Sequence, residues 1–145
     1  MRFWDSSAIV PLLVLEKETD LCLKALDVDP ATMVWTMSQV EVLSAICRRV
    51  REGCLSEDSL DIVKKRMQVF FDSAFEIVSI QKVKDRALRL LQVHSLKAAD
   101  ALQLASALVV TQEDPIKMPI MSFDNQLNQA ARREGFVVNP EMDNL

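Results

Sequence analysis

The chain contains very little glycine. Only two of its 145 residues are glycine, Gly53 and Gly135. Each follows an Arg-Glu pair at the end of a helical pattern, where glycine readily takes the left-handed conformation that ends a helix. No glycine remains for a loop that cradles phosphate groups. The P-loop and the dinucleotide-binding fingerprint are therefore absent, which excludes the nucleotide-binding enzymes that depend on them.

Cysteine and histidine are scarce as well. The three cysteines form no CxxC pair, which indicates free thiols in a reducing cytosol. The single histidine, His94, cannot supply a histidine-rich zinc site. Because it falls on an apolar helical stripe, we interpret it as a packed or helix-end residue rather than as the base of a nucleophilic triad.

Long hydrophobic runs and a strong net charge are also missing. No apolar run reaches the roughly 18 residues of a membrane helix, and Asp5 interrupts the stretch where a signal peptide would continue. We therefore expect a cytoplasmic protein with no membrane partner. The formal charge of −4 argues against a DNA-coating protein. It does not exclude an enzyme that acts on nucleic acids, because carboxylates that bind metal ions add negative charge to this sum.

What the sequence does contain is an alternation of short β-like runs and longer helical patterns. The predicted strands cover residues 1–4, 33–36, 75–80, 119–122 and 136–138. The predicted helices cover residues 6–14, 16–27, 38–52, 56–74, 82–94, 97–110 and 125–134. Strands separated by helices indicate a parallel sheet covered on both faces. We predict an α/β fold, a three-layer α/β/α sandwich with a central, mainly parallel sheet of about five strands. It forms a single domain over residues 1–138, followed by a short polar tail at 139–145.

Four carboxylates fall where this scaffold would bring them together. Asp5 follows the first strand, Asp124 lies just beyond the fourth, and Glu41 lies in the first turn of the helix after the second. In open parallel sheets, ligands bind outside the carboxyl ends of the strands. Asp100 begins a helix that is apolar nearly all round, where an unpaired charge is costly.

Each acid also has a purely structural interpretation. Asp5 and Asp124 precede helices and could serve as N-caps. The run from Ser38 to Glu41 matches a capping box, in which Glu41 would bond back to the helix start. For Asp100 the helix dipole offsets only about 0.3–1 kcal/mol, so a functional role is favoured there.

Convergence of the four acids would predict a metal site. Like charges about 4 Å apart repel by roughly 4 kcal/mol at an effective dielectric constant of about 20, and the sequence shows no obvious buried Lys or Arg to balance them. All-oxygen ligands suit Mg²⁺ or Mn²⁺. Such an ion activates water and neutralises charge on a phosphate group, which predicts phosphoryl chemistry.

Four stretches of the sequence resemble the PIN-domain ribonucleases, and among these the VapC-type toxins of toxin–antitoxin pairs. The stretches are Arg2–Val10, Ser38–Ile46, Leu96–Ala107, and Ser122–Leu127 with the following Ala130-Ala131 and Gly135-Phe136. The likeness runs from Met1 to about Val138. No single motif is specific, but the order Asp, Glu, Asp-Ala and Ser-x-Asp at these spacings is fairly specific.

The resemblance implies a metal-dependent endoribonuclease that cleaves RNA phosphodiester bonds. It implies that one or two Mg²⁺ or Mn²⁺ ions are held by Asp5, Glu41, Asp100 and Asp124. Ser6 and Ser122 match hydroxyl positions of the family and would orient carboxylates or water, although turn or cap serines explain them equally well. The family further implies a homodimer and neutralisation by a small cognate antitoxin.

The remaining polar candidates are weaker. Arg48 lies two turns beyond Glu41 on roughly the same helix face, so it is the best candidate to meet an RNA phosphate, although charged runs are usually solvated. Gln103, one turn beyond Asp100, receives no role. The apolar stripe around Val63 is expected to pack on its own sheet rather than to form an interface.

Other functions stay open at this point. A phosphotransfer receiver has the same broad architecture, but no acid follows the third predicted strand to accept a phosphate. A catalytically silent PIN-fold binding module would retain the acids without turnover. Hydrolysis of a metal-bound nucleotide or of a DNA flap would use the same chemistry, and fold analogy does not choose among these substrates.

Overall fold

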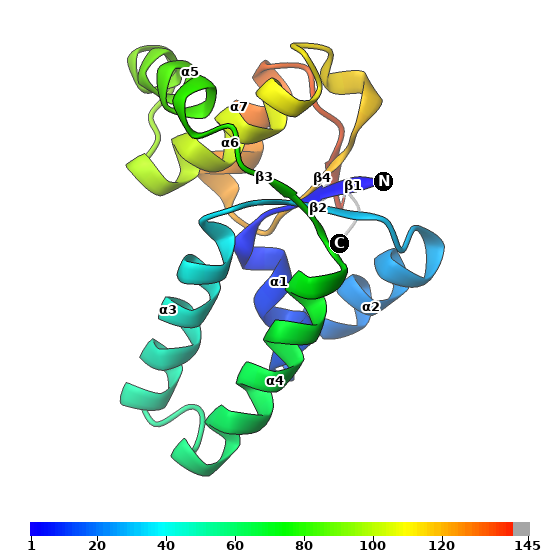
Figure 1. Cartoon of the computed structure of the whole chain (residues 1–145), viewed down its shortest axis with the longest axis vertical. Coiled ribbons are helices and arrows are strands. Elements are labelled where there is room, and N and C mark those ends of the chain that lie inside the picture. The colour runs from blue at the N-terminus through cyan, green and yellow to red at the C-terminus, as the bar shows by residue number, and fades with distance from the viewer. Residues whose placement is uncertain (141–145) are drawn as a thin grey trace.

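A five-stranded sheet forms the centre of the protein (Figure 1). The structure is a computed structural model that describes residues 1–140. The strands are β1 (Arg2–Trp4), β2 (Thr32–Trp35), β3 (Phe75–Ile77), β4 (Ile120–Met121) and β5 (Val138–Asn139). Their order is β3-β2-β1-β4-β5 and every pairing is parallel. The predicted parallel sheet is confirmed.

Helices cover both faces of this sheet, as predicted. One group is α1 (Ser6–Leu13), α2 (Thr19–Val28), α3 (Ser38–Arg51) and α4 (Glu57–Ser73). The other group is α5 (Ile80–Val93), α6 (Ala98–Val110) and α7 (Asn125–Arg133). Figure 1 shows the first group below the strands and the second group above them, so the fold is a three-layer α/β/α sandwich.

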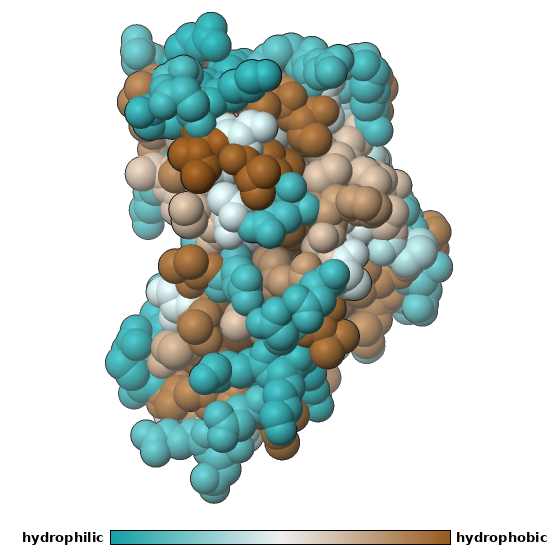
Figure 2. Space-filling model, in the orientation of Figure 1, coloured by the Kyte–Doolittle hydropathy of each residue, from teal (hydrophilic) through white to brown (hydrophobic). Residues whose placement is uncertain are grey.

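The strands build two separate cores because neighbouring side chains of a strand point to opposite faces. Phe3 packs with α5, α6 and α7, while Trp4 packs with the helices of the other layer, and neither side chain is exposed. A shift of one residue would exchange the two faces, so burial on both sides fixes the register of the sheet. In α4, Val63 and Met67 join the second core, which confirms that this stripe packs internally. The outward surfaces of α4 and α5 are largely hydrophilic (Figure 2).

Two strand predictions are wrong at their ends. The third strand stops at Ile77 rather than at residue 80, because Ile80 already begins α5 and the backbone N–H of Val83 donates to the carbonyl of Ser79. The last strand is Val138–Asn139 rather than residues 136–138. Asn139, expected in the tail, instead pairs with Met121. The part of the predicted tail at residues 141–145 lies outside the described residues.

Both glycines end helices, as their sequence context predicts. Gly53 has a φ of +77° and Gly135 a φ of +98°, each directly after the C-cap residue of a helix. His94 is the C-cap residue of α5 and is buried, in agreement with its interpretation as a packed residue. No helix among residues 1–140 is long and apolar enough to cross a membrane.

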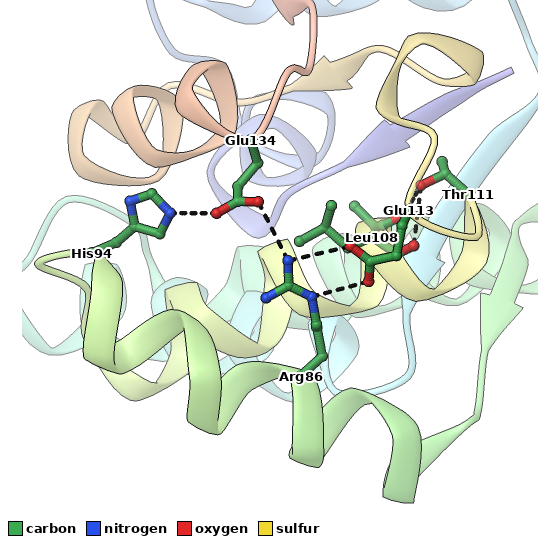
Figure 3. Close-up of polar contacts among 7 residues, drawn as sticks. Arg86, His94, Leu108, Thr111, Glu113 and Glu134 are labelled. Carbon is green, nitrogen blue, oxygen red and sulfur yellow. Dashed lines mark hydrogen bonds and ion pairs between the residues drawn. The ribbon is translucent and has the colours of Figure 1, made fainter.

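An ion-pair network ties α5 to the end of α7 (Figure 3). His94 Nε2 lies 2.6 Å from Glu134 Oε1. Arg86 donates to Glu134 at 3.3 Å and, through two nitrogens, to Glu113 at 3.0 and 3.2 Å. None of these side chains lines the carboxylate pocket described below, so the histidine contributes to the scaffold.

The strand order places a crevice between β1 and β4. The connections that follow β1 and β2 run over one face of the sheet, whereas those that follow β3 and β4 run over the other face. The connections that leave β1 and β4, which are neighbours in the sheet, therefore run to opposite faces. In open α/β sheets, this switch point at the carboxyl ends of the strands is where ligands bind.

Candidate active site

All four predicted acids line one pocket at this switch point. The pocket has a volume of about 610 Å³, and its wall includes Asp5, Glu41, Asp100 and Asp124. They come from the end of β1, the first turns of α3 and α6, and the segment after β4. The sheet thus brings together acids that are up to 119 positions apart in the sequence.

Asp5 is both a helix cap and a wall of the pocket. Its Oδ2 accepts hydrogen bonds from Ser7 Oγ at 2.5 Å, from the Ser7 N–H at 3.1 Å and from Ser122 Oγ at 3.2 Å. The side chain is only 3% exposed. The interpretation of Asp5 as a helix cap is therefore confirmed. It is compatible with a functional role, because all three bonds are to Oδ2 and leave Oδ1 available.

Glu41 does not form the predicted capping box. No side chain caps α3, and Ser38 points instead to Gln103. Glu41 Oε2 accepts from Ser6 Oγ at 2.9 Å and from Gln103 Nε2 at 3.1 Å. Donors on α1 and α6 thus take the place of the capping bond to the start of α3. They hold the Glu41 carboxylate at the pocket rather than against its own helix.

The other two acids are held more loosely. Asp124 is the N-cap of α7, as its position suggested, and its Oδ1 accepts from the Leu127 N–H at 2.8 Å. Asp100 is half-buried in the first turn of α6. Within residues 1–140 it accepts no hydrogen bond, and its local stabilisation comes from the dipole of α6 and from the charge of Lys97, which lowers its pKa.

Three of the carboxylates share one arrangement. In each, the protein donors converge on a single oxygen, and the other oxygen has no hydrogen-bond partner in the described part of the chain. The oxygens left available are Asp5 Oδ1, Glu41 Oε1 and Asp124 Oδ2. The donors therefore orient each carboxylate while one oxygen keeps its lone pairs for a ligand.

The electrostatics show that the acids interact with one another. Burial, and after it the charges of Asp124, Asp5 and Glu41, together raise the pKa of Asp100 to about 6, against a lowering effect of Lys97. Burial also raises the pKa of Asp5 and of Glu41, and their hydroxyl and amide donors oppose the rise. No ion pair within residues 1–140 involves any of the four. The pocket therefore gathers four carboxylates, none of which is paired directly with a basic side chain, although Arg48 and Arg49 also line it.

This donor set suits a hard divalent cation. The ligands on offer are carboxylate oxygens without nitrogen or sulfur, which is the preference of Mg²⁺ and Mn²⁺. As placed, no three His, Cys, Asp or Glu side chains of the described chain stand close enough to hold one ion. Holding one ion with three of these acids would therefore require them to move closer together.

Two polar contacts of the site were missed at the sequence level. Ser7 supplies two of the bonds to Asp5, and its hydroxyl also accepts from the Phe123 N–H. Gln103 bonds to Glu41 and is fully buried. A signal existed for Gln103, because it is a large polar residue inside an otherwise apolar helix. Ser6 and Ser122, which the sequence did single out, contact Glu41 and Asp5 respectively.

Two neighbouring arginines at the far end of the pocket differ in their contacts. Arg49 is bound to Glu16, with Nε 2.5 Å from Oε1, and also donates to the carbonyl of Ala45. Arg48 is exposed, lines the same pocket and forms no ion pair within the described residues. Of the two, only Arg48 has its charge available to a ligand.

Comparison with known proteins agrees with this architecture. Ribonuclease VapC45 of Mycobacterium tuberculosis (strain CDC 1551 / Oshkosh) is 29% identical over 138 residues, which cover 95% of this chain and 94% of that protein. The crystal structure of FitAcB from Neisseria gonorrhoeae superimposes with a TM-score of 0.65 at 13% identity, covering 95% and 96% of the two chains. A toxin–antitoxin complex from Klebsiella pneumoniae gives a TM-score of 0.59 at 16% identity over 86% and 87%. The family model of the PIN domain matches residues 2–133, nearly the whole chain, and the protein therefore belongs to the PIN domain family.

Proposed function

We propose that this protein is a metal-dependent endoribonuclease and the toxin of a toxin–antitoxin pair. The observation that carries the proposal is the pocket lined by four carboxylates, none of them in an ion pair within residues 1–140, at the switch point of a PIN-domain sheet. The relative named Ribonuclease VapC45 supports the RNase activity, because its likeness covers 95% of this chain.

The proposed metal ligands are Asp5, Glu41, Asp100 and Asp124, which would hold one or two Mg²⁺ or Mn²⁺ ions. A bound ion of this kind supplies an activated water and neutralises charge that develops on the phosphate. Ser122 orients Asp5 and Ser6 orients Glu41 through the hydrogen bonds described above. Both serines therefore act on carboxylates rather than on the substrate.

RNA would enter along α3. Arg48 follows Glu41 by seven residues, which corresponds to about 10 Å along a helix. A phosphate group close to the scissile bond would lie within reach of an arginine at that distance. Contacts to phosphates position a nucleic acid without reading its sequence. We therefore assign Arg48 to backbone binding and not to base recognition.

The proposal includes a cognate antitoxin, because one of the similar solved structures is a toxin–antitoxin complex. A homodimer and a cytoplasmic site of action follow from the family resemblance. The receiver-like alternative loses support, since receiver domains have the strand order 2-1-3-4-5 and this sheet has the order β3-β2-β1-β4-β5. The alternative of a silent binding module is left to experiment.

The test avoids choosing one RNA in advance. The purified protein is incubated with total bacterial RNA and Mn²⁺, and new RNA ends are mapped by sequencing. We expect discrete new ends that disappear with EDTA and in Asp5→Asn, while Asp61→Asn, which removes a charge from the exposed face of α4, cleaves like the wild type. A folded, Mn²⁺-binding wild type that produces no new ends would refute the nuclease and favour the binding module.

A further inference from the structure

Gln103 is the one large polar side chain that α6 buries completely. A buried amide costs free energy unless its donors and acceptor find partners. Gln103 Nε2 lies 2.9 Å from Ser6 Oγ, 3.0 Å from Ser38 Oγ and 3.1 Å from Glu41 Oε2. Because an NH₂ group has two N–H donors, one of them is shared between two of these acceptors. All of these partners belong to α1 or α3. The amide thus links three helices at the base of the carboxylate pocket.

The contacts determine which way the amide faces. Ser6 Oγ donates its only proton to Glu41, so it must accept from the NH₂ group of Gln103. Ser38 Oγ donates to Gln103 Oε1 at 3.3 Å and accepts from Nε2, which closes the network on the other side. With the amide reversed, its carbonyl oxygen would face the Glu41 carboxylate and repel it. Glu41 and Ser6 therefore select the orientation in which the NH₂ group meets Glu41, while Ser38, which contacts both atoms of the amide, holds the amide on its other side.

We propose that Gln103 is the positioning residue of Glu41. Together with Ser6 it holds Oε2, so that Oε1 is presented to a divalent cation. The inference rests on the proposed function, because it assigns Gln103 to a ligand of that metal site.

The chemistry of the side chain fits this role. A neutral amide donates to a carboxylate without forming an ion pair, so the negative charge of Glu41 stays available for a cation. A lysine or arginine at position 103 would neutralise that charge. Gln103 lies one turn beyond Asp100 on α6, so the same helix supplies one acid directly and orients a second acid through its amide.

The experiment measures Mn²⁺ affinity by electron paramagnetic resonance of the free ion. The variant Gln103→Met keeps the length and apolar volume of the side chain and removes its donors. The control Ser106→Ala alters another buried polar residue of α6, whose hydroxyl donates to the backbone carbonyl of Gln103 and not to its side-chain amide. Changes to groups that orient a metal ligand weaken affinity by roughly 10- to 100-fold, and we expect a loss in this range for Gln103→Met. Ser106→Ala should bind like the wild type.

A second variant covers the case in which Gln103→Met does not fold, as judged by circular dichroism without metal. Ser38→Ala leaves Gln103 and Glu41 in place but removes both contacts of the amide with Ser38, so the amide is held less firmly against Glu41 and Mn²⁺ binding should weaken, by less than in Gln103→Met. Mn²⁺ binding by the wild type and by Ser38→Ala with equal affinity would overturn the inference.

The outcomes separate this inference from the proposed function. If the wild type and Gln103→Met bind Mn²⁺ equally, the positioning role is wrong while the metal site stands. An equal loss in Ser106→Ala would attribute the effect to the packing of α6 and would also overturn the role. If the wild type binds no Mn²⁺ at millimolar concentration, the metal site and the positioning role fail together.

Discussion

Replacing Asp100 with asparagine should stabilise the metal-free protein at neutral pH. Burial and the three neighbouring acids raise the pKa of Asp100 from 3.8 to about 6 in the folded state. Because the folded state holds this proton more tightly than the unfolded chain, the stability that the group contributes is complete below pH 3.8. It is lost as the pH rises through about 6. Asparagine remains neutral and avoids that loss.

The magnitude follows from the shift. A difference of about two pKa units corresponds to about 3 kcal/mol. Asp100 is only half-buried, so screening by solvent reduces the expected effect to about 1–2 kcal/mol. For a domain of this length, such a gain raises Tm by about 3–8 °C. Near pH 4 the two proteins should differ little, because most of the aspartate is then protonated in the folded state.

The assay is thermal unfolding in EDTA at pH 4 and at pH 7.5, for the wild type, Asp100→Asn and the exposed control Asp61→Asn. Repeating it with Mn²⁺ should reverse the order at pH 7.5. A ligand at a hundredfold excess over its Kd stabilises by about 2.7 kcal/mol, and only a protein with the complete carboxylate set should gain fully. A lower Tm for Asp100→Asn than for the wild type in EDTA at pH 7.5 would refute the argument from uncompensated charge.

Four further substitutions, one of them a control, test the RNA contact and the scaffold. Arg48→Ala should weaken RNA binding, measured by fluorescence anisotropy, and reduce the magnitude of the slope of log K against log salt concentration by about 1. The rate of single-turnover cleavage at saturating protein should stay the same, and an unchanged salt slope would contradict the phosphate contact. Gly135→Ala should cost about 1–2 kcal/mol in urea unfolding, because φ is +98° and the new Cβ would lie 3.3 Å from Pro115 Cγ. Gly53→Ala, with open space around it, should cost less, and equal losses would rule out the contact with Pro115. Arg86→Met should cost about 1–3 kcal/mol because it breaks charge-assisted bonds to two carboxylates, and no loss in urea unfolding would show the network to be solvated.

Much of the fold was predictable because it depends on periodicity and chain order. The strand that ends at Trp4 and the nearly apolar helix around Leu104 follow from local patterns, and the alternation of the two element types predicts a parallel sheet. Chain order also predicts that acids directly after β1 and β4 share an edge. The strand ends were less predictable, because residues 78–80 carry a β-like apolar pattern, yet β3 continues only while β2 lies beside it.

The local interpretation of Glu41 failed for a physical reason. A capping box is a pattern within four residues, and the sequence contains it from Ser38 to Glu41. In the folded chain Gln103, 62 positions away from Glu41, offers a donor to this carboxylate and satisfies Ser38 as well. The bonds from Gln103 to Ser38 and Glu41 also satisfy a buried amide, which has no access to water. They therefore contribute more than a capping-box bond, whose donor and acceptor could bond to water instead.

The sequence by itself determined which residues carry charge, which faces are apolar, and therefore the layered sheet and the edge at which the acids gather. Only the tertiary structure decided which oxygen of each carboxylate is held and which one is left for a ligand. It also decided that Arg49 is paired with Glu16, whereas Arg48 forms no ion pair among residues 1–140. The physical reason is that hydrogen bonds depend on distances of about 3 Å between groups far apart in the chain, whereas spacing along a sequence specifies only which face or edge a residue occupies.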